Sequence, residues 1–61
     1  MSNATHTDVK SARERLGWSQ KRLADELGVD QATISRWERD DSRVPLMARR
    51  VMDSLLSELA N

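Results

Sequence analysis

Two short helical patterns joined by one tight glycine turn constrain this chain more than any other feature. Helices joined so closely must cross steeply, which requires a small residue where their backbones approach and a glycine where the chain reverses. Ala24 and Gly28 meet these two requirements. The apolar residues that mark the inner faces are Leu23, Leu27, Val29, Ile34 and Trp37. The outer side of the second of these two helices is then left free to fit into a groove of another molecule.

The remaining segments also have helical spacing, and no segment alternates with the period of a strand. We expect helices over residues 8–16, 20–27, 31–39 and about 45–60. Ser19 and Asp30 are suitable N-caps, Gly17 and Gly28 suit the helix ends, and Pro45 suits a first turn. The sequence therefore predicts an all-α, compact four-helix domain over residues 7–61, with a loop at residues 40–43.

The last predicted helix has more apolar residues than one face can hold. A stripe of Ala48, Val51, Leu55 and Leu59 is expected to close the core. The surplus apolar residues suggest either a dimer face or a thicker monomer core, and the sequence leaves both alternatives open. The candidates for the dimer face are Met47, Met52, Leu56 and Leu59.

Composition excludes several classes of protein. The chain has 61 residues, no cysteine and one histidine, His6, so we expect no metal site, no cofactor and no enzymatic activity. No stretch is apolar enough to span a bilayer, and a chain without cysteine fits the cytoplasm. Residues 1–6 are expected to be a disordered tail or a cloning remnant. Ten basic and ten acidic residues give a net charge of +0, so any contact with phosphates depends on local placement.

Two segments carry a resemblance to a known family. LGWSQKRLA at residues 16–24 and LGVDQATISRWER at residues 27–39 resemble the Cro/repressor-type (Xre-like) helix-turn-helix family. The resemblance covers about residues 9–45, with the motif itself at about 20–39. It implies a lambda-repressor-like fold that binds double-stranded DNA and reads the major groove with residues 31–39.

The resemblance also implies roles for two glutamines. In lambdoid repressors a Gln opens each helix of the motif; the first contacts phosphate and braces the second, which binds an adenine. Gln20 and Gln31 occupy these positions. Together with Gln31, the outward residues Ala32, Ser35 and Arg36 are the predicted base contacts, since Arg can bind guanine and Ala can contact a thymine methyl group.

The predicted contacts to the DNA backbone come from both helices of the motif and from the loop that follows. They are Gln20, Lys21, Arg22, Thr33, Arg39 and Arg43. Trp18 and Trp37 lie at inward positions and are expected in the core. Arg49 and Arg50 are expected on a solvated face of the last helix.

Family members often pair an Arg of the first helix with a Glu late in the third. The resemblance therefore implies an ion pair between Arg13 and Glu38. The sequence departs from the family at Asp40, where many members have Gly. We expect Asp40 to tolerate a left-handed backbone there. With Asp41, it places two negative charges near the expected phosphate path.

Two functions from different classes follow. The first is a transcriptional regulator, a repressor in a bacterial or phage-infected cell, that binds a palindromic operator as a two-fold dimer. The alternative is an antitoxin-like or other protein-interaction module with the same fold, whose last helix binds another protein. The neutral net charge favours the alternative slightly.

Overall fold

The structure, a computed structural model, describes the backbone of residues 8–60 and the side chains of residues 8–59. The expected tail at residues 1–6, including His6, lies outside the described residues. The elements are the helices α1 (Val9–Leu16), α2 (Gln20–Leu27), α3 (Gln31–Arg39) and α4 (Leu46–Ala60), with a 3₁₀ turn, η1 (Asp41–Arg43), before α4. No strand occurs in the described range, so the predicted all-α class is confirmed.

The helix ends follow the capping residues. Asp8, Ser19 and Asp30 have extended backbones, and each side chain accepts a hydrogen bond from the backbone N–H three residues on, at 2.7–3.0 Å. Gly17 and Gly28 end α1 and α2 with φ values of 73° and 75°. Because only glycine adopts this conformation without strain, these two residues fix where the chain turns.

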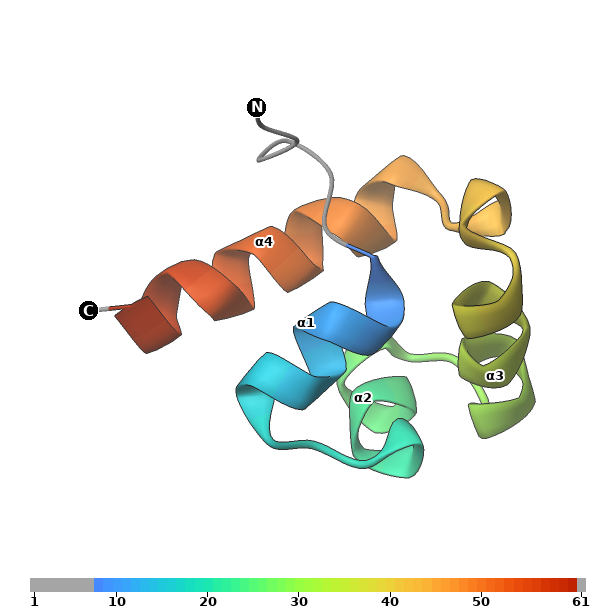
Figure 1. Ribbon diagram of the computed structural model, residues 1–61, viewed down its shortest axis with the longest axis horizontal. Coiled ribbons are helices and arrows are strands. Elements are labelled where there is room, and N and C mark those ends of the chain that lie inside the picture. Colours follow the sequence, from blue (N-terminus) through green and yellow to red (C-terminus); the bar gives the residue numbers. More distant parts are fainter. Residues whose placement is uncertain (1–7, 61) are drawn as a thin grey trace.

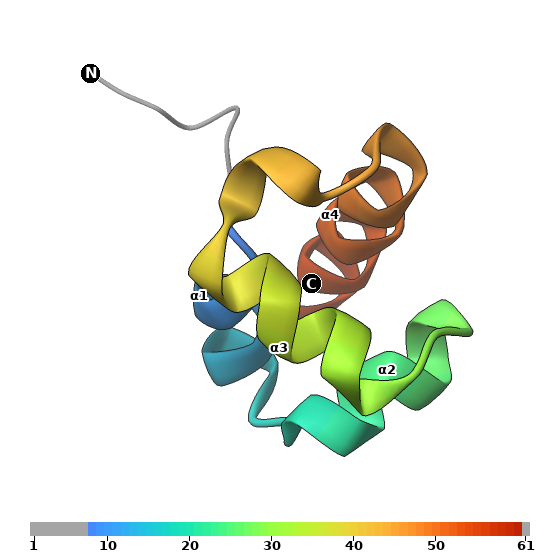
Figure 2. The ribbon, with the colours of Figure 1, turned by 90° about the vertical axis from the view of Figure 1, so that its right-hand side faces the viewer.

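The helices enclose a small apolar core. α2 packs against α3, while α4 lies along α1 (Figure 1). Viewed from the α3 side, α3 lies across the front of the molecule with α2 beneath it (Figure 2). The buried residues come from all four helices and the segment before α4: Val9, Ala12, Leu23, Ala24, Ile34, Trp37, Val44, Ala48, Met52 and Leu56. Trp18 is half-buried against this core rather than within it.

The predicted inner stripe of α4 was wrong by part of a turn. Ala48, Met52 and Leu56 are buried, whereas Val51 and Leu59 are exposed. The buried stripe is rotated by about 55° from the predicted one, since successive residues are about 100° apart around a helix. Met52 and Leu56 therefore belong to the core and are not available for the dimer face predicted from the sequence.

The exit from α3 also differs from the expectation. Asp40 has an extended backbone, with φ −140° and ψ 91°, not a left-handed one. Its carboxylate caps η1 by accepting hydrogen bonds from the backbone N–H of Ser42 at 3.2 Å and from its hydroxyl at 2.6 Å. An N-cap requires an extended backbone, so this role of Asp40 excludes the left-handed backbone that the sequence led us to expect.

Candidate nucleic-acid interface

The third helix has one buried face and one polar face. Ile34 and Trp37 are in the core, and Gln31, Ala32 and Arg36 are exposed on the other side. Ser35, which was also predicted to contact a base, is half-buried. The packing of α3 therefore turns the predicted base-contact residues away from the core.

A chain of hydrogen bonds connects α1 to the start of α3. Arg13 Nε donates to Glu38 Oε2 at 2.7 Å, and its NH1 donates to the carbonyl of Trp18 at 3.1 Å. Gln20 Nε2 donates to Glu38 Oε1 at 3.1 Å, and Gln31 Nε2 donates to Gln20 Oε1 at 3.3 Å. The expected ion pair and the expected glutamine brace are thus both present, and Glu38 joins them into one network.

The Arg13–Glu38 pair lies partly inside the domain. The side chains of Arg13 and Glu38 are 19% and 11% exposed. The hydrogen bond with Glu38 raises the pKa of the Arg13 guanidinium above its ordinary value, although burial opposes that shift. A pair with this little solvent cannot lose one partner without leaving the other charge poorly compensated. The pair therefore holds α1, α3 and Gln20 in a fixed arrangement.

The first turn of α3 contains a second polar group. Thr33 donates to Asp30 Oδ1 from its backbone N–H at 2.9 Å and from its hydroxyl at 2.6 Å. Arg36 NH2 donates to the same hydroxyl at 3.1 Å. Both protons of Thr33 are thus used, which leaves it no donor for the predicted phosphate contact. Hydrogen bonds from Thr33, the side-chain one first, lower the pKa of Asp30.

The basic residues of α2 lie on its exposed side and have acidic partners one turn away. Lys21 Nζ is 3.5 Å from Asp25 Oδ2, and Arg22 Nε is 3.3 Å from Glu26 Oε2. The Arg22 guanidinium also lies over the Trp18 ring, 4.4 Å from its centroid. Exposed pairs of this kind contribute little to stability, so phosphates can compete for both cations.

The residues after α3 pair more extensively than the sequence suggested. Arg43 Nε is 3.2 Å from Asp40 Oδ2, and the hydrogen bond from Ser42 lowers the pKa of Asp40. Arg49 NH2 lies 2.9 Å from Asp41 Oδ2 and 2.7 Å from the Asp41 carbonyl.

The structural role of Arg49 was therefore missed. No sequence signal reveals it, because the η1 turn brings residues eight apart into contact. The two aspartates face arginines, which compensates their charge beside the predicted interface.

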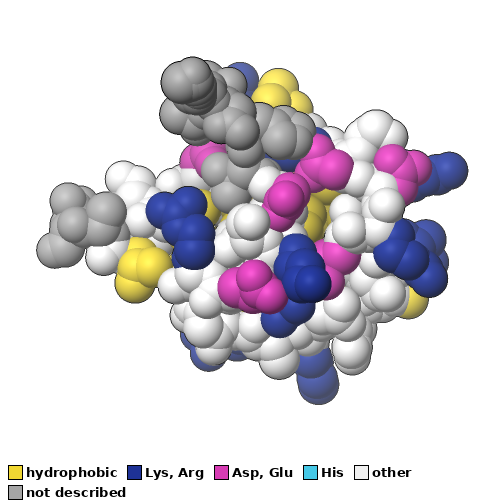
Figure 3. All heavy atoms as spheres, viewed as in Figure 1, with side chains coloured by type: hydrophobic (Ala, Val, Ile, Leu, Met, Phe, Trp, Pro, Cys, Tyr) yellow, Lys and Arg dark blue, Asp and Glu magenta, His cyan; other side chains and the backbone are white. Residues whose placement is uncertain are grey.

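Charges of both signs are mixed on one face of the molecule. On the face seen in Figure 3, Lys and Arg side chains alternate with Asp and Glu, and no field of one sign covers it. Within the described residues, no group of three or more His, Cys, Asp or Glu side chains is arranged to hold a metal ion. Among the helices described, none is both long and apolar enough to cross a membrane.

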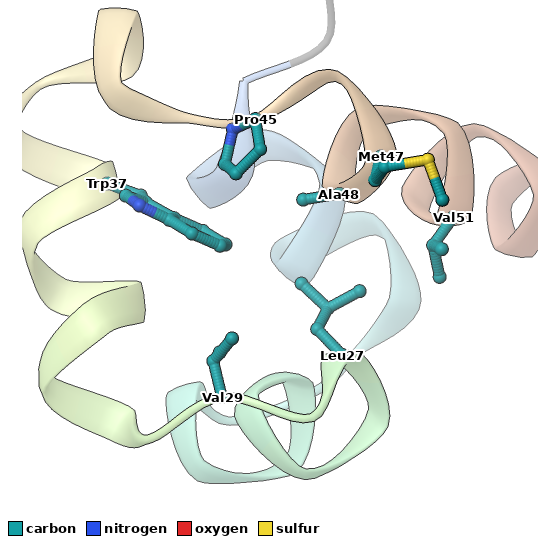
Figure 4. A pocket seen from close by; sticks show the side chains of 7 residues that line it. All are labelled: Leu27, Val29, Trp37, Pro45, Met47, Ala48 and Val51. Atoms are coloured by element: carbon teal, nitrogen blue, oxygen red, sulfur yellow. The ribbon is translucent and has the colours of Figure 1, made fainter.

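An apolar groove lies between the turn after α2 and the first half of α4. Its volume is about 300 Å³, and in Figure 4 residues of the α2–α3 motif face residues of α4 across it. Met47, at its edge, is 70% exposed. The lining is Leu27, Val29, Trp37, Pro45, Met47, Ala48 and Val51.

The comparison with family models agrees with this geometry. The model described as Helix-turn-helix matches residues 9–48, which is most of the chain. The chain belongs to the Cro/Xre-type helix-turn-helix family. Members of this family are DNA-binding transcription regulators, and the family is not an enzymatic one. No curated protein and no solved structure is a significant match to the chain.

Proposed function

We propose that this helix-turn-helix protein is a sequence-specific repressor that reads the major groove of double-stranded DNA with α3. The observation that carries the proposal is the hydrogen bond from Gln31 Nε2 to Gln20 Oε1. It holds an exposed side chain at the start of α3, although no packing requires it to be held. An ordered amide on an exposed surface is what bidentate base recognition needs.

The exposed side of α3 supplies the base contacts. Gln31 reads adenine through N6 and N7, Ala32 contacts a thymine methyl group, and Arg36 reads guanine through O6 and N7. Arg36 is directed by Thr33, which accepts its hydrogen bond at 3.1 Å. Ser35 contributes a hydroxyl to a base edge or a phosphate from a half-buried position.

The backbone contacts come from the ends of the motif. The second N–H of Gln20 and the free N–H groups at the start of α2 bind a phosphate. Lys21, Arg22, Arg39 and Arg43 supply positive charge around them. Since most of these cations also have acidic neighbours, we expect moderate affinity from one domain.

Two copies that bind together raise the affinity above that of one domain. A two-fold dimer on a palindromic operator places the two α3 helices about 34 Å apart, one turn of DNA. The exposed side chains of Met47 and Leu59 remain from the face predicted for dimerisation. We place this regulator in the cytoplasm of a bacterial or phage-infected cell, acting without catalysis or a cofactor.

The alternative is an antitoxin-like protein-interaction module. The apolar groove and the exposed Met47 favour it, as does the net charge of +0. A partner that binds there would need Met47 in the absence of DNA, and its binding would be indifferent to Gln31.

Selection of bound sites from random DNA tests the proposal. We expect a palindromic consensus, and Gln31→Ala should lose base preference at one position per half-site, at a cost of about 1–3 kcal/mol. Arg36→Ala should do the same at another position, while Arg50→Ala, a change of the same kind on exposed α4, should leave the consensus unchanged. Affinity should fall with salt because phosphate contacts release counterions.

An equal loss for all sequences in Gln31→Ala would contradict base reading. Failure to select any consensus, together with partner binding that depends on Met47, would favour the interaction module.

A further inference from the structure

Glu38 lies on the core side of α3, yet it is connected to the residue at the centre of the predicted interface. Its two oxygens accept from Arg13 at 2.7 Å and from Gln20 at 3.1 Å, and Gln20 accepts from Gln31 at 3.3 Å. We infer that Glu38 is a positioning residue that selects adenine over guanine by setting the orientation of two amides. The inference rests on the proposed reading of DNA by Gln31.

Glu38 fixes the orientation of the Gln20 amide. A carboxylate only accepts hydrogen bonds, so Gln20 must present its NH₂ end to Glu38. Its carbonyl end is then directed at Gln31, where it can only accept. One carboxylate thereby removes one of the two orientations of the Gln20 amide.

Gln20 in turn fixes the orientation of the Gln31 amide. Gln31 must turn its own NH₂ group inward, because the Gln20 carbonyl requires a donor. What remains for DNA is the Gln31 carbonyl and the second N–H. Adenine offers a complementary N6–H donor and N7 acceptor, whereas guanine offers the two acceptors O6 and N7. The Gln31 carbonyl would face a guanine acceptor, so this orientation rejects guanine.

Replacing the carboxylate with an amide should reverse the orientation. In Glu38→Gln, residue 38 has one carbonyl, and the guanidinium of Arg13, which can only donate, takes it. The NH₂ group of residue 38 then faces Gln20, which must turn its carbonyl toward it and its NH₂ toward Gln31. Gln31 follows by turning its carbonyl inward, so that two N–H donors face the DNA. Two donors match the two acceptors of guanine.

The test measures binding to two operators that differ at a single base pair, the one read by Gln31. This base pair is identified beforehand as the position at which Gln31→Ala loses its base preference. The native protein should favour adenine by about tenfold or more. Glu38→Gln should favour guanine at that position and keep its preferences elsewhere. Glu26→Gln is the matched control, since it neutralises a carboxylate paired with Arg22 on exposed α2 and should leave adenine preferred.

A second variant keeps the test decisive if Glu38→Gln fails to fold, which its thermal unfolding would report. Gln20→Ala retains the Arg13–Glu38 pair but breaks the relay, so the adenine and guanine operators should bind within about twofold of each other.

Adenine preference retained at full strength in Gln20→Ala or in folded Glu38→Gln would overturn the inference. Weaker binding of Gln20→Ala to both operators is expected as well, because Gln20 also binds a phosphate, so the ratio of the two affinities is the quantity that decides. A native protein without any base preference would instead contradict the proposed function itself.

Discussion

Helices α3 and α4 are both amphipathic, but they encode their orientation very differently. The nine residues of α3 contain two large apolar side chains, Ile34 and Trp37, and both are buried. The fifteen residues of α4 contain apolar side chains around most of the helix, and large ones such as Leu46 and Met47 are more than half exposed. A helix with few apolar residues has one way to bury them, whereas a helix with many has several.

This difference explains why the polar face of α3 was easier to predict than the buried stripe of α4. Burying Ile34 and Trp37 leaves Gln31 and Arg36 outside by helical geometry alone. The buried stripe of α4 is instead chosen by the shape of the core surface against which it packs, to which α1 contributes most directly. The groove beside Met47 is a consequence, since α4 does not cover that part of the motif completely.

The largest effect expected from this comparison is on the two methionines of α4. Met52 is 0% exposed and Met47 is 70% exposed, five residues apart on the same helix. Met52→Ala should lower the free energy of unfolding by about 2–5 kcal/mol because it leaves a cavity. Met47→Ala should change it by no more than about 0.5 kcal/mol. Chemical denaturation of both variants measures the difference, and equal effects would show that the stripe has been misplaced.

A smaller effect is expected where α2 crosses α3. Ala24 is 2% exposed at the crossing, and Ala32 is exposed on the outer side of α3. Ala24→Leu should destabilise the domain by about 1–3 kcal/mol through overpacking. Ala32→Leu makes the same change on a surface and should leave the melting temperature nearly unchanged. An undiminished melting temperature in Ala24→Leu would mean that the crossing has room for a larger side chain.

The smallest effect concerns the cap of α3, which does not depend on packing against α4. The pKa of Asp30 lies below its ordinary value of 3.8, first because the Thr33 hydroxyl donates to it. A carboxylate whose pKa is lower when folded stabilises the domain above its unfolded pKa, and this contribution is lost as the pH falls below about 4.

Asp30→Asn keeps a capping oxygen but cannot titrate. The difference in melting temperature between the native protein and Asp30→Asn should therefore shrink as the pH falls through and below the ordinary carboxyl pKa of 3.8. Asp25→Asn is the control, because its carboxylate accepts only a 3.5 Å bond from Lys21. If the difference in melting temperature between the native protein and Asp30→Asn does not change with pH, the Asp30 cap does not contribute to the acid sensitivity of the domain.

Local chemistry made the helix ends predictable. Ser19 and Asp30 cap helices because their short side chains accept the free N–H groups of the first turn, which requires no partner elsewhere. Asp40 shows the limit of the same approach. Asp40 is both the C-cap of α3 and the N-cap of η1, and the η1 turn that its carboxylate caps depends on the path of the chain toward α4.

The sequence by itself determined where the helices begin and end and which side of α3 is polar, because capping and helical periodicity act within a few residues. The tertiary structure decided which side of α4 is buried, because several stripes compete and only the opposing surface distinguishes them. It also decided that Glu38 reaches Gln20, and that Asp41 meets Arg49. These contacts depend on distances between separate elements, which no local pattern specifies.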